Sequence, residues 1–207
     1  MWVYLLNMAV SEVPTFTQLS TLRKRPFFTS VEARDAGVHP SLLSYYVEKN
    51  LLERVGRGVY RDPKVDSGVD FQWEDLVYAA VSVPDSVICL ISALSYYEMT
   101  EEIPRVHWLA IPHTATPPKR ALLKIVRMRK IDLGAERIQI GKINVRIFDR
   151  EKTVVDAFRY LSRETSIKAL RAYVDPKKGW KPDLQKLAFY ARELRVPMDP
   201  YILAVTT

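Results

Sequence analysis

The residues whose types and spacing best suit chemistry lie between Pro40 and Arg61, and that chemistry is nucleic-acid recognition. Hydroxyl and aromatic side chains share one face of a predicted helix, and arginines follow in a short hairpin. Such a helix can reach bases or phosphates in a major groove, while hairpin arginines hold the backbone or minor groove. We therefore predict a double-stranded DNA interface made by Ser41, Ser44, Tyr45, Lys49, Arg54, Arg57 and Arg61.

Two short helices joined by a tight turn are predicted to position this helix face. Thr29 precedes Glu32 by three residues, which is the spacing of a capping box and predicts that a helix begins here. Gly37 tolerates the positive φ that often ends a helix. His39 is the predicted N-cap of the second helix, and Pro40 suits its first position because proline lacks the N–H that would be unsatisfied there.

The helix Pro40–Lys49 is predicted to be amphipathic. Leu43, Tyr46, Val47 and Asn50 follow the i, i+3, i+4, i+7 spacing and should face the core, opposite a face that also carries Glu48. A hairpin is predicted next, from residues 52–55 and 59–61 joined at Gly56-Arg57-Gly58. Together with a first helix over residues 15–24, whose Phe16, Leu19 and Leu22 would pack on it, this predicts a winged helix-turn-helix domain over residues 1–62.

The run from Ala36 to Arg61 resembles the N-terminal winged helix of the AbiEi antitoxins, which belong to abortive-infection type IV toxin-antitoxin pairs. The matching features are Ala36-Gly37-Val38, Leu43, Tyr46-Val47, Leu52-Glu53-Arg54-Val55 and Gly58-Val59-Tyr60-Arg61. Weaker similarity occurs in residues 92–99, in the strand that ends at Ala110-Ile111-Pro112 and in residues 148–157. The sequence departs from the family at Pro40, Leu42 and Glu48, since members usually carry more Arg or Lys on this helix.

A second domain of mixed α/β character is predicted over residues 69–207, after a polar linker at residues 63–68, so that the whole chain is α+β. The expected helices are 71–83, 92–99 capped by Ser92, 149–160 capped by Asp149, 166–174 and 183–194. The expected strands are 105–111, 123–128, 138–140 and 143–148. Cys89 lies in an apolar run and is expected to be a buried thiol, as is usual in a reducing cytoplasm.

Charge is unevenly distributed along the chain. Residues 119–207 hold 21 Lys/Arg against 10 Asp/Glu, a net charge of +11, whereas residues 63–118 hold 2 against 8, a net charge of −6. The first 62 residues carry 8 against 6 and account for only +2 of the total +7. The basic C-terminal part therefore suggests a second anionic partner, either RNA or an acidic protein surface, although solvated helix faces explain the excess equally well.

Catalytic and cofactor motifs are not found in the sequence. The three histidines are not part of a CxxC-containing or HExxH metal-binding motif, and no P-loop, GxGxxG or GxSxG is present. We therefore expect neither an enzyme nor a cofactor. Asp149, Glu151 and Asp156 could hold a metal, but a helix N-cap and a Lys152/Asp156 i,i+4 pair explain them more simply. A Vsr-like endonuclease half would need converging acids and a lysine, for which Asp132, Glu136 and Lys142 are the candidate set.

The first ten residues are apolar but too few to span a bilayer and have no basic n-region, so we expect no membrane insertion and a cytoplasmic protein. They also leave open whether translation starts at Met1 or at Met8.

The resemblance to AbiEi antitoxins implies a DNA-binding antitoxin that represses its own operon, through inverted repeats in its promoter, and counters a nucleotidyltransferase-like toxin encoded next door. Direct contact with that toxin and indirect opposition at its target are both compatible with the sequence. The principal alternative is a transcription regulator whose second domain senses a ligand, which would require an enclosed apolar pocket with a few polar groups.

Overall fold

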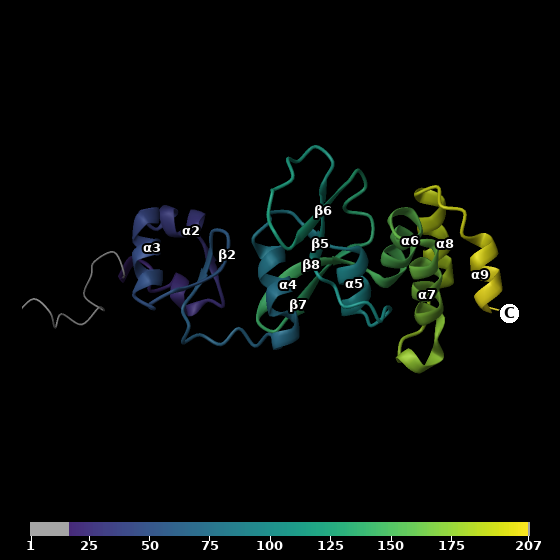
Figure 1. Cartoon of the computed structure of the whole chain (residues 1–207), viewed down its shortest axis with the longest axis horizontal. Coiled ribbons are helices and arrows are strands. Elements are labelled where there is room, and N and C mark those ends of the chain that lie inside the picture. The colour runs from purple at the N-terminus through teal and green to yellow at the C-terminus, as the bar shows by residue number, and fades with distance from the viewer. Residues whose placement is uncertain (1–16, 207) are drawn as a thin grey trace, which may run out of the picture. The chain divides into compact units, whose positions relative to one another are not determined.

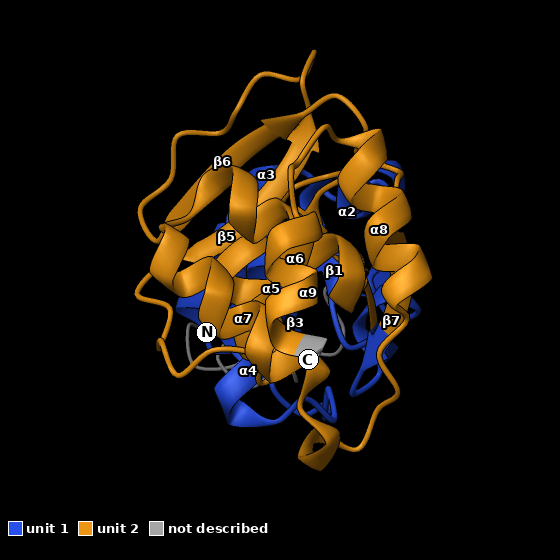
Figure 2. Ribbon diagram, turned by 90° about the vertical axis from the view of Figure 1, so that its right-hand side faces the viewer, with its two compact units in different colours: residues 1–82, 139–143 blue, residues 83–138, 144–207 orange. Residues whose placement is uncertain are grey.

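The computed structural model describes residues 17–206, and this part of the chain divides into two compact units (Figures 1 and 2). Unit 1 runs to Ser82 and includes residues 139–143, whereas unit 2 holds Val83–Ile138 and the chain from Asn144 onward. Both units combine helices with β-strands, which confirms the predicted α+β class. Phe16 and the choice between Met1 and Met8 lie outside the described residues.

Unit 1 begins with a segment that is compatible with the predicted winged helix-turn-helix. Its elements are η2 (Leu22–Lys24), β1 (Phe28–Thr29), α2 (Ser30–Asp35), α3 (Pro40–Glu48), β2 (Glu53–Gly56) and β3 (Val59–Arg61). The strands form an antiparallel sheet in the order β1-β3-β2, with Phe28 opposite Tyr60 and Glu53 opposite Arg61. The hairpin β2–β3, which we call the wing, therefore follows directly on the two helices.

The predicted caps of α2 and α3 are present. Thr29 N donates to Glu32 Oε2 at 2.7 Å and Glu32 N donates to Thr29 Oγ1 at 3.2 Å, so the capping box is reciprocal. Gly37 has φ +84°, as the predicted turn requires. His39 Nδ1 accepts from Ser41 N at 3.3 Å and Pro40 occupies the first turn of α3.

The winged segment has a core of its own. Its buried members come from α2, α3, β1, β3 and the turns beside them, namely Leu19, Phe28, Ala33, Val38, Leu43, Tyr46, Leu52 and Tyr60. Leu22 and Val47 are partly buried and pack against this core, as predicted. The prediction for Asn50 was wrong, because α3 ends at Glu48 and Asn50 turns the chain with φ +54° and an exposed side chain.

One further difference concerns the first predicted helix. The predicted continuous helix to Lys24 is replaced after residue 18 by turns and the 3-10 helix η2, where Ser20 and Thr21 are weak helix formers. Unit 1 continues through an irregular stretch, residues 62–70, into α4 (Phe71–Val81). The turn at residues 139–143 is grouped with this unit, and Lys142 N there donates to the carbonyl of Ser67 at 2.8 Å.

A mixed sheet occupies the centre of unit 2. Its strands are β4 (Val87–Ile88), β5 (His107–Pro112), β6 (Leu123–Met128), β7 (Ala135–Ile140) and β8 (Ile143–Phe148), in the spatial order β6-β5-β4-β8-β7. Strand β4 is antiparallel to β5 and parallel to β8, and β5 is parallel to β6. Strand β4 was not predicted, because two residues are too few to show an alternating pattern.

The helices of unit 2 pack on this sheet and on one another. They are α5 (Leu90–Tyr96), α6 (Arg150–Tyr160), α7 (Arg163–Val174), η3 (Pro176–Lys178), α8 (Leu184–Glu193) and α9 (Asp199–Thr206). Asp149 caps α6 as predicted, since its Oδ1 accepts from Lys152 N at 2.7 Å. Ser92 does not cap α5. It lies inside that helix, which begins after Cys89, and its Oγ accepts from Trp108 N at 2.9 Å. Helix α9 was not predicted.

Cys89 is fully buried, as expected, and burial raises the pKa of its thiol well above the usual value. Within the described residues, no helix is both long and apolar enough to cross a membrane.

Candidate nucleic-acid interface

The exposed face of α3 carries the side chains that sequence analysis assigned to DNA. Ser41, Ser44, Tyr45 and Glu48 are all exposed, and their spacing places them on one face of the helix. The Tyr45 side chain is 45% exposed although it is aromatic. Lys49 follows at the C-cap, and its Nζ lies 5.7 Å from the centroid of the Tyr45 ring. This face therefore offers hydroxyls, a phenol, an ammonium and the carboxylate of Glu48 to solvent.

The start of α3 holds its first hydroxyl in place. His39 Nδ1 lies 2.8 Å from Ser41 Oγ in addition to accepting from Ser41 N, so the ring and the hydroxyl restrict each other. Both residues are exposed. His39 was predicted as a cap but not as a neighbour of the interface, although its position two residues before Ser41 indicated this.

Arg54 and Arg57 project from the wing. Both are exposed, and neither forms an ion pair with any described residue. Arg57 lies in the turn, where Gly58 takes φ +72°, and the pairing of β2 with β3 shifts register between Arg54 and Gly56. Ser30 N donates to the Gly58 carbonyl at 2.8 Å, which attaches the turn to the start of α2. The wing thus presents two available guanidinium groups on an anchored turn.

Arg61 is placed differently from the other wing arginines. Its Nε donates to Glu53 Oε2 at 2.6 Å and its Nη1 donates to Glu74 Oε1 at 2.7 Å and to Tyr78 Oη at 3.2 Å. Burial opposes its charge, but the hydrogen bonds to Glu53 and Tyr78 raise the pKa of Arg61 above its usual value. A phosphate would have to compete with two carboxylates for this guanidinium.

The basic run Arg23-Lys24-Arg25 is also largely engaged within unit 1. Arg23 Nε and Nη2 donate to Asp62 Oδ2 at 2.9 and 2.5 Å, and Arg25 Nη1 donates to Glu32 Oε1 at 2.6 Å. Lys24 is exposed. Asp62 is 39 residues from Arg23, so no local pattern could have indicated this pairing.

The segment that contains this interface matches a known family. Residues 18–61 match the family model described as "Transcriptional regulator, AbiEi antitoxin". This segment is therefore similar to the AbiEi antitoxin regulators. The match confirms the resemblance of the run from Ala36 to Arg61 and ends at the last residue of the wing. No curated protein matches the chain.

Beyond the AbiEi segment, the acidic cluster on α6 is neutralised by neighbouring side chains. Asp156 is buried and pairs with buried Lys152 and, at 2.7 Å, with Arg159. Lys186 Nζ lies 3.0 Å from Asp149 Oδ2 and 3.1 Å from Glu151 Oε2. The cluster thus matches the structural interpretation, and the described residues contain no group of acids, histidines or cysteines that could hold a metal.

The three residues considered for an endonuclease site each have a separate partner. Asp132 pairs with Arg146 at 2.6 Å, Glu136 accepts from Tyr97 Oη at 2.9 Å, and Lys142 lies 3.4 Å from Asp66. These contacts show no shared site among the three, so they lend no support to a Vsr-like second half.

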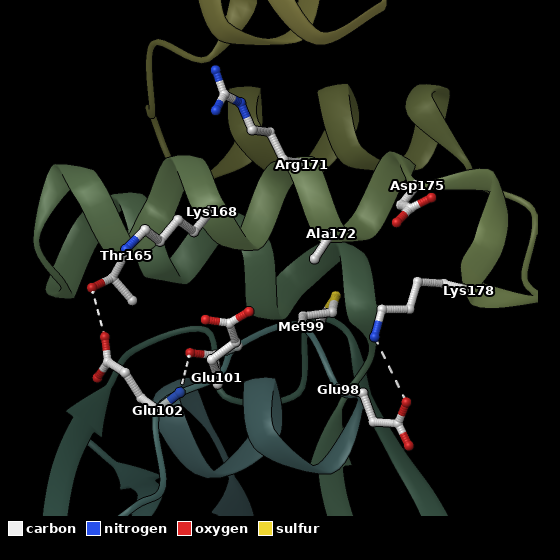
Figure 3. A pocket seen from close by; sticks show the side chains of 11 residues that line it. Glu98, Met99, Glu101, Glu102, Thr165, Lys168, Arg171, Ala172, Asp175 and Lys178 are labelled. Atoms are coloured by element: carbon white, nitrogen blue, oxygen red, sulfur yellow. Dashed lines mark hydrogen bonds and ion pairs between the residues drawn. The ribbon is translucent and has the colours of Figure 1, made fainter.

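Unit 2 contains a pocket of about 600 Å³ between the loop after α5 and helix α7 (Figure 3). The loop supplies acidic side chains, and α7 with the following turn supplies basic ones: Glu98, Glu101 and Glu102 against Lys168, Arg171 and Lys178. Across the pocket, Thr165 Oγ1 donates to Glu102 Oε1 at 3.0 Å. A ligand-sensing regulator would need a mainly apolar cavity, so this charged lining does not favour that alternative.

Proposed function

We propose that the protein is a DNA-binding antitoxin that represses its own operon and counters a nucleotidyltransferase-like toxin. The observation that carries the proposal is the exposed polar face of α3 beside two available arginines, within the segment that matches the AbiEi regulators. Since its operator is genomic DNA, the protein would act in the cytoplasm.

In this proposal α3 lies in a major groove. Ser41, Ser44 and Tyr45 approach bases or phosphates, and Lys49 approaches the backbone. Arg54 and Arg57 hold the backbone or the adjacent minor groove. Arg61 contributes by fixing the wing, because its guanidinium already binds Glu53 and Glu74. On an inverted repeat, two copies would place their α3 helices about one helical turn, roughly 34 Å, apart.

The antitoxin part of the proposal rests on the family description and on the charge of the chain after residue 118. A net charge of +11 there suits an anionic partner, which is either an acidic surface of the toxin or the nucleic acid on which the toxin acts. Both routes lead to the same outcome in the cell, which is growth despite the toxin.

Binding to the promoter tests the regulatory half of the proposal. Anisotropy of a labelled duplex from the region upstream of the gene should show salt-dependent binding by the full chain. The variant Arg54→Ala/Arg57→Ala should bind at least tenfold more weakly. A matched variant, Arg137→Ala/Lys177→Ala, removes the same charge from exposed positions of unit 2 and should bind like the unaltered protein. If both double variants lost the same amount of DNA affinity, the wing would not be part of the interface.

Co-expression with the product of the neighbouring gene tests the antitoxin half. We expect that gene product to stop growth alone and to be harmless beside the full chain. The wing variant Arg54→Ala/Arg57→Ala, expressed from an unrelated promoter, should still rescue growth if neutralisation resides in unit 2. A harmless neighbour, or a toxic one that the full chain does not counter, would contradict the antitoxin function and leave a DNA-binding regulator.

A further inference from the structure

A basic groove lies in unit 2, at a distance in sequence from the AbiEi segment. It has a volume of about 1020 Å³, and its basic lining consists of Arg127, Arg129, Lys130, Lys152, Arg159 and Arg195, with Glu193 as an acidic member. These residues come from the end of β6, from α6 and from the turn after α8, elements that are labelled in Figure 1. Cations from three separate elements converge here, which a solvated face of one helix would not produce.

Part of this charge is balanced within the protein. Lys130 Nζ lies 2.7 Å from Glu193 Oε2, and buried Asp156 pairs with both Lys152 and Arg159. By contrast, three arginines of the groove are exposed and form no ion pair with any described residue: Arg127, Arg129 and Arg195. The groove therefore keeps an excess of guanidinium groups, which suit the planar, multiple hydrogen bonding of phosphate.

The backbone at Arg195 supports a role for its side chain. Arg195 has φ +56° in the turn that ends α8, a conformation that glycine adopts freely and that other residues adopt at a cost. A non-glycine residue in such a position is a reason to look for a function of its side chain. Here the side chain lines the groove.

One side of the groove can also contact a base. Tyr160 lines it with a side chain that is 39% exposed, and Arg159 Cζ lies 4.9 Å from the centroid of the Tyr160 ring. Ile125 and Val126 of β6 supply apolar surface nearby. Stacking of bases on tyrosine and arginine beside a basic groove is the usual mode of sequence-tolerant binding to single strands.

We propose that this basic groove binds the phosphate groups of a nucleotide, carried by a free nucleoside triphosphate or by the end of an RNA strand. Its volume of about 1020 Å³ slightly exceeds the usual range for small-ligand sites, about 300–1,000 Å³, and leaves room for one nucleotide with its phosphates. Arg127, Arg129 and Arg195 hold the phosphates, and Tyr160 lies against the base. This inference goes beyond the proposed operator binding because it concerns a ligand of unit 2.

Anisotropy with the full chain tests the groove, using as separate probes a fluorescent nucleoside triphosphate and a labelled ten-nucleotide single-stranded RNA. We expect at least one probe to bind, and inorganic triphosphate but not the unphosphorylated nucleoside to displace it. Arg127→Ala/Arg129→Ala should weaken binding about tenfold or more. If RNA is the ligand, this variant should also reduce the salt slope by about 1.4, which is about 0.7 per lost contact.

Arg195→Gly separates binding from folding. Because glycine relieves the positive φ, this variant should melt at the same temperature as the unaltered protein or higher, yet bind the probe several-fold more weakly. The matched variant Arg137→Ala/Lys177→Ala, which leaves the groove intact, should bind within twofold of the unaltered protein.

The two probes also distinguish the sources of the phosphate. Binding of the triphosphate alone identifies a free nucleotide, and binding of RNA alone identifies a strand end. Three results would overturn the proposal: no binding of either probe at low salt, equal weakening by the matched variant, or displacement by polyglutamate as effective as by inorganic triphosphate. Operator binding is measured separately on the same variants, which keep Arg54 and Arg57, so failure of this inference and failure of the proposed function are distinguishable.

Discussion

Arg61 Nη1 donates to Glu74 Oε1 at 2.7 Å, which ties the last residue of the wing to the first turn of α4. The same guanidinium binds Glu53 on the neighbouring strand. The wing is therefore held at its base by an ion-pair network and at its turn by the hydrogen bond from Ser30 N to the Gly58 carbonyl. An anchored wing presents Arg54 and Arg57 with little conformational freedom to lose on binding.

Arg61→Ala should reduce stability more than it reduces electrostatic attraction to DNA. The side chains of Arg61 and Glu74 are 21% and 27% exposed, so the network is partly buried, and its loss should cost about 1 kcal/mol. In a chain of this length that corresponds to a fall in Tm of roughly 2–4 °C. Thermal unfolding checks this, with the exposed Arg57→Ala as a control expected to stay within about 0.5 kcal/mol. Equal melting temperatures would contradict the structural role of Arg61.

Arg57→Ala should weaken binding to all DNA sequences alike. When one phosphate contact is lost, fewer counterions are released on binding. The slope of log K against log salt should therefore fall in magnitude by about 0.9. The measurement is a salt titration of duplex binding with both a promoter fragment and an unrelated fragment. Ser44→Ala is the matched comparison, since a lost hydroxyl should leave the slope unchanged. A slope unaffected by Arg57→Ala would place the wing away from the phosphates.

Glu32 should make stability depend on acid pH. Burial raises its pKa, but hydrogen bonds from Thr29 and Arg25 outweigh burial and leave the pKa of Glu32 below the usual 4.5. A carboxyl whose pKa is lower in the folded state stabilises the protein above the unfolded pKa, and this contribution disappears as pH falls through the folded pKa.

Glutamine can still accept from Thr29 N but carries no charge for Arg25, so Glu32→Gln should cost about 0.5 kcal/mol at pH 7, and the difference from the unaltered protein should shrink below pH 4.5. Denaturant unfolding of both proteins at pH 7 and at pH 3 measures this difference in the free energy of unfolding. The exposed Glu48→Gln is the control and should cost little at pH 7. A penalty for Glu32→Gln that is the same at pH 7 and pH 3 would contradict a stabilising role for the negative charge of Glu32.

Asp156→Asn should be strongly destabilising, because it leaves the ammonium of Lys152 buried without a counter-charge. Both side chains are at most 1% exposed, and breaking such a pair typically costs about 3–5 kcal/mol. Adding Lys152→Met to Asp156→Asn should recover part of this loss, since methionine is uncharged and of similar length. Denaturant unfolding of the unaltered protein, the two single variants and the double variant completes a double-mutant cycle. A double variant less stable than the sum of the single effects would contradict the account.

Several elements followed from short-range patterns. The capping box of Thr29 and Glu32, the cap at His39 with Pro40, and the cap at Asp149 were all predicted and are present. The strand over residues 123–128 was predicted with its observed bounds. Errors arose where an apparent local signal was overridden, as at Ser92, whose hydroxyl accepts from the neighbouring strand instead of capping α5.

For the candidate interface, too, the sequence predicted local features such as exposure but not contacts with distant residues. Exposure of Ser41, Ser44 and Tyr45 followed from helical periodicity, and exposure of Arg57 from its position in a turn between glycines. The state of Arg61 did not follow, because its guanidinium meets Glu74, which is 13 residues away on a helix of its own. Periodicity reports which way a side chain faces, but not which partner it meets there.

The sequence by itself determined the features whose hydrogen bonds and packing span a few residues: the helix caps, the turn glycine at Gly37, the amphipathic face of α3 and the wing hairpin. Only the tertiary structure decided which charges remain available, because ion pairing depends on the path of the chain. The fold pairs Arg23 with Asp62 and binds the Arg61 guanidinium inside unit 1. It also brings Arg127 and Arg129, at the end of β6, together with Arg195, after α8, in one basic groove.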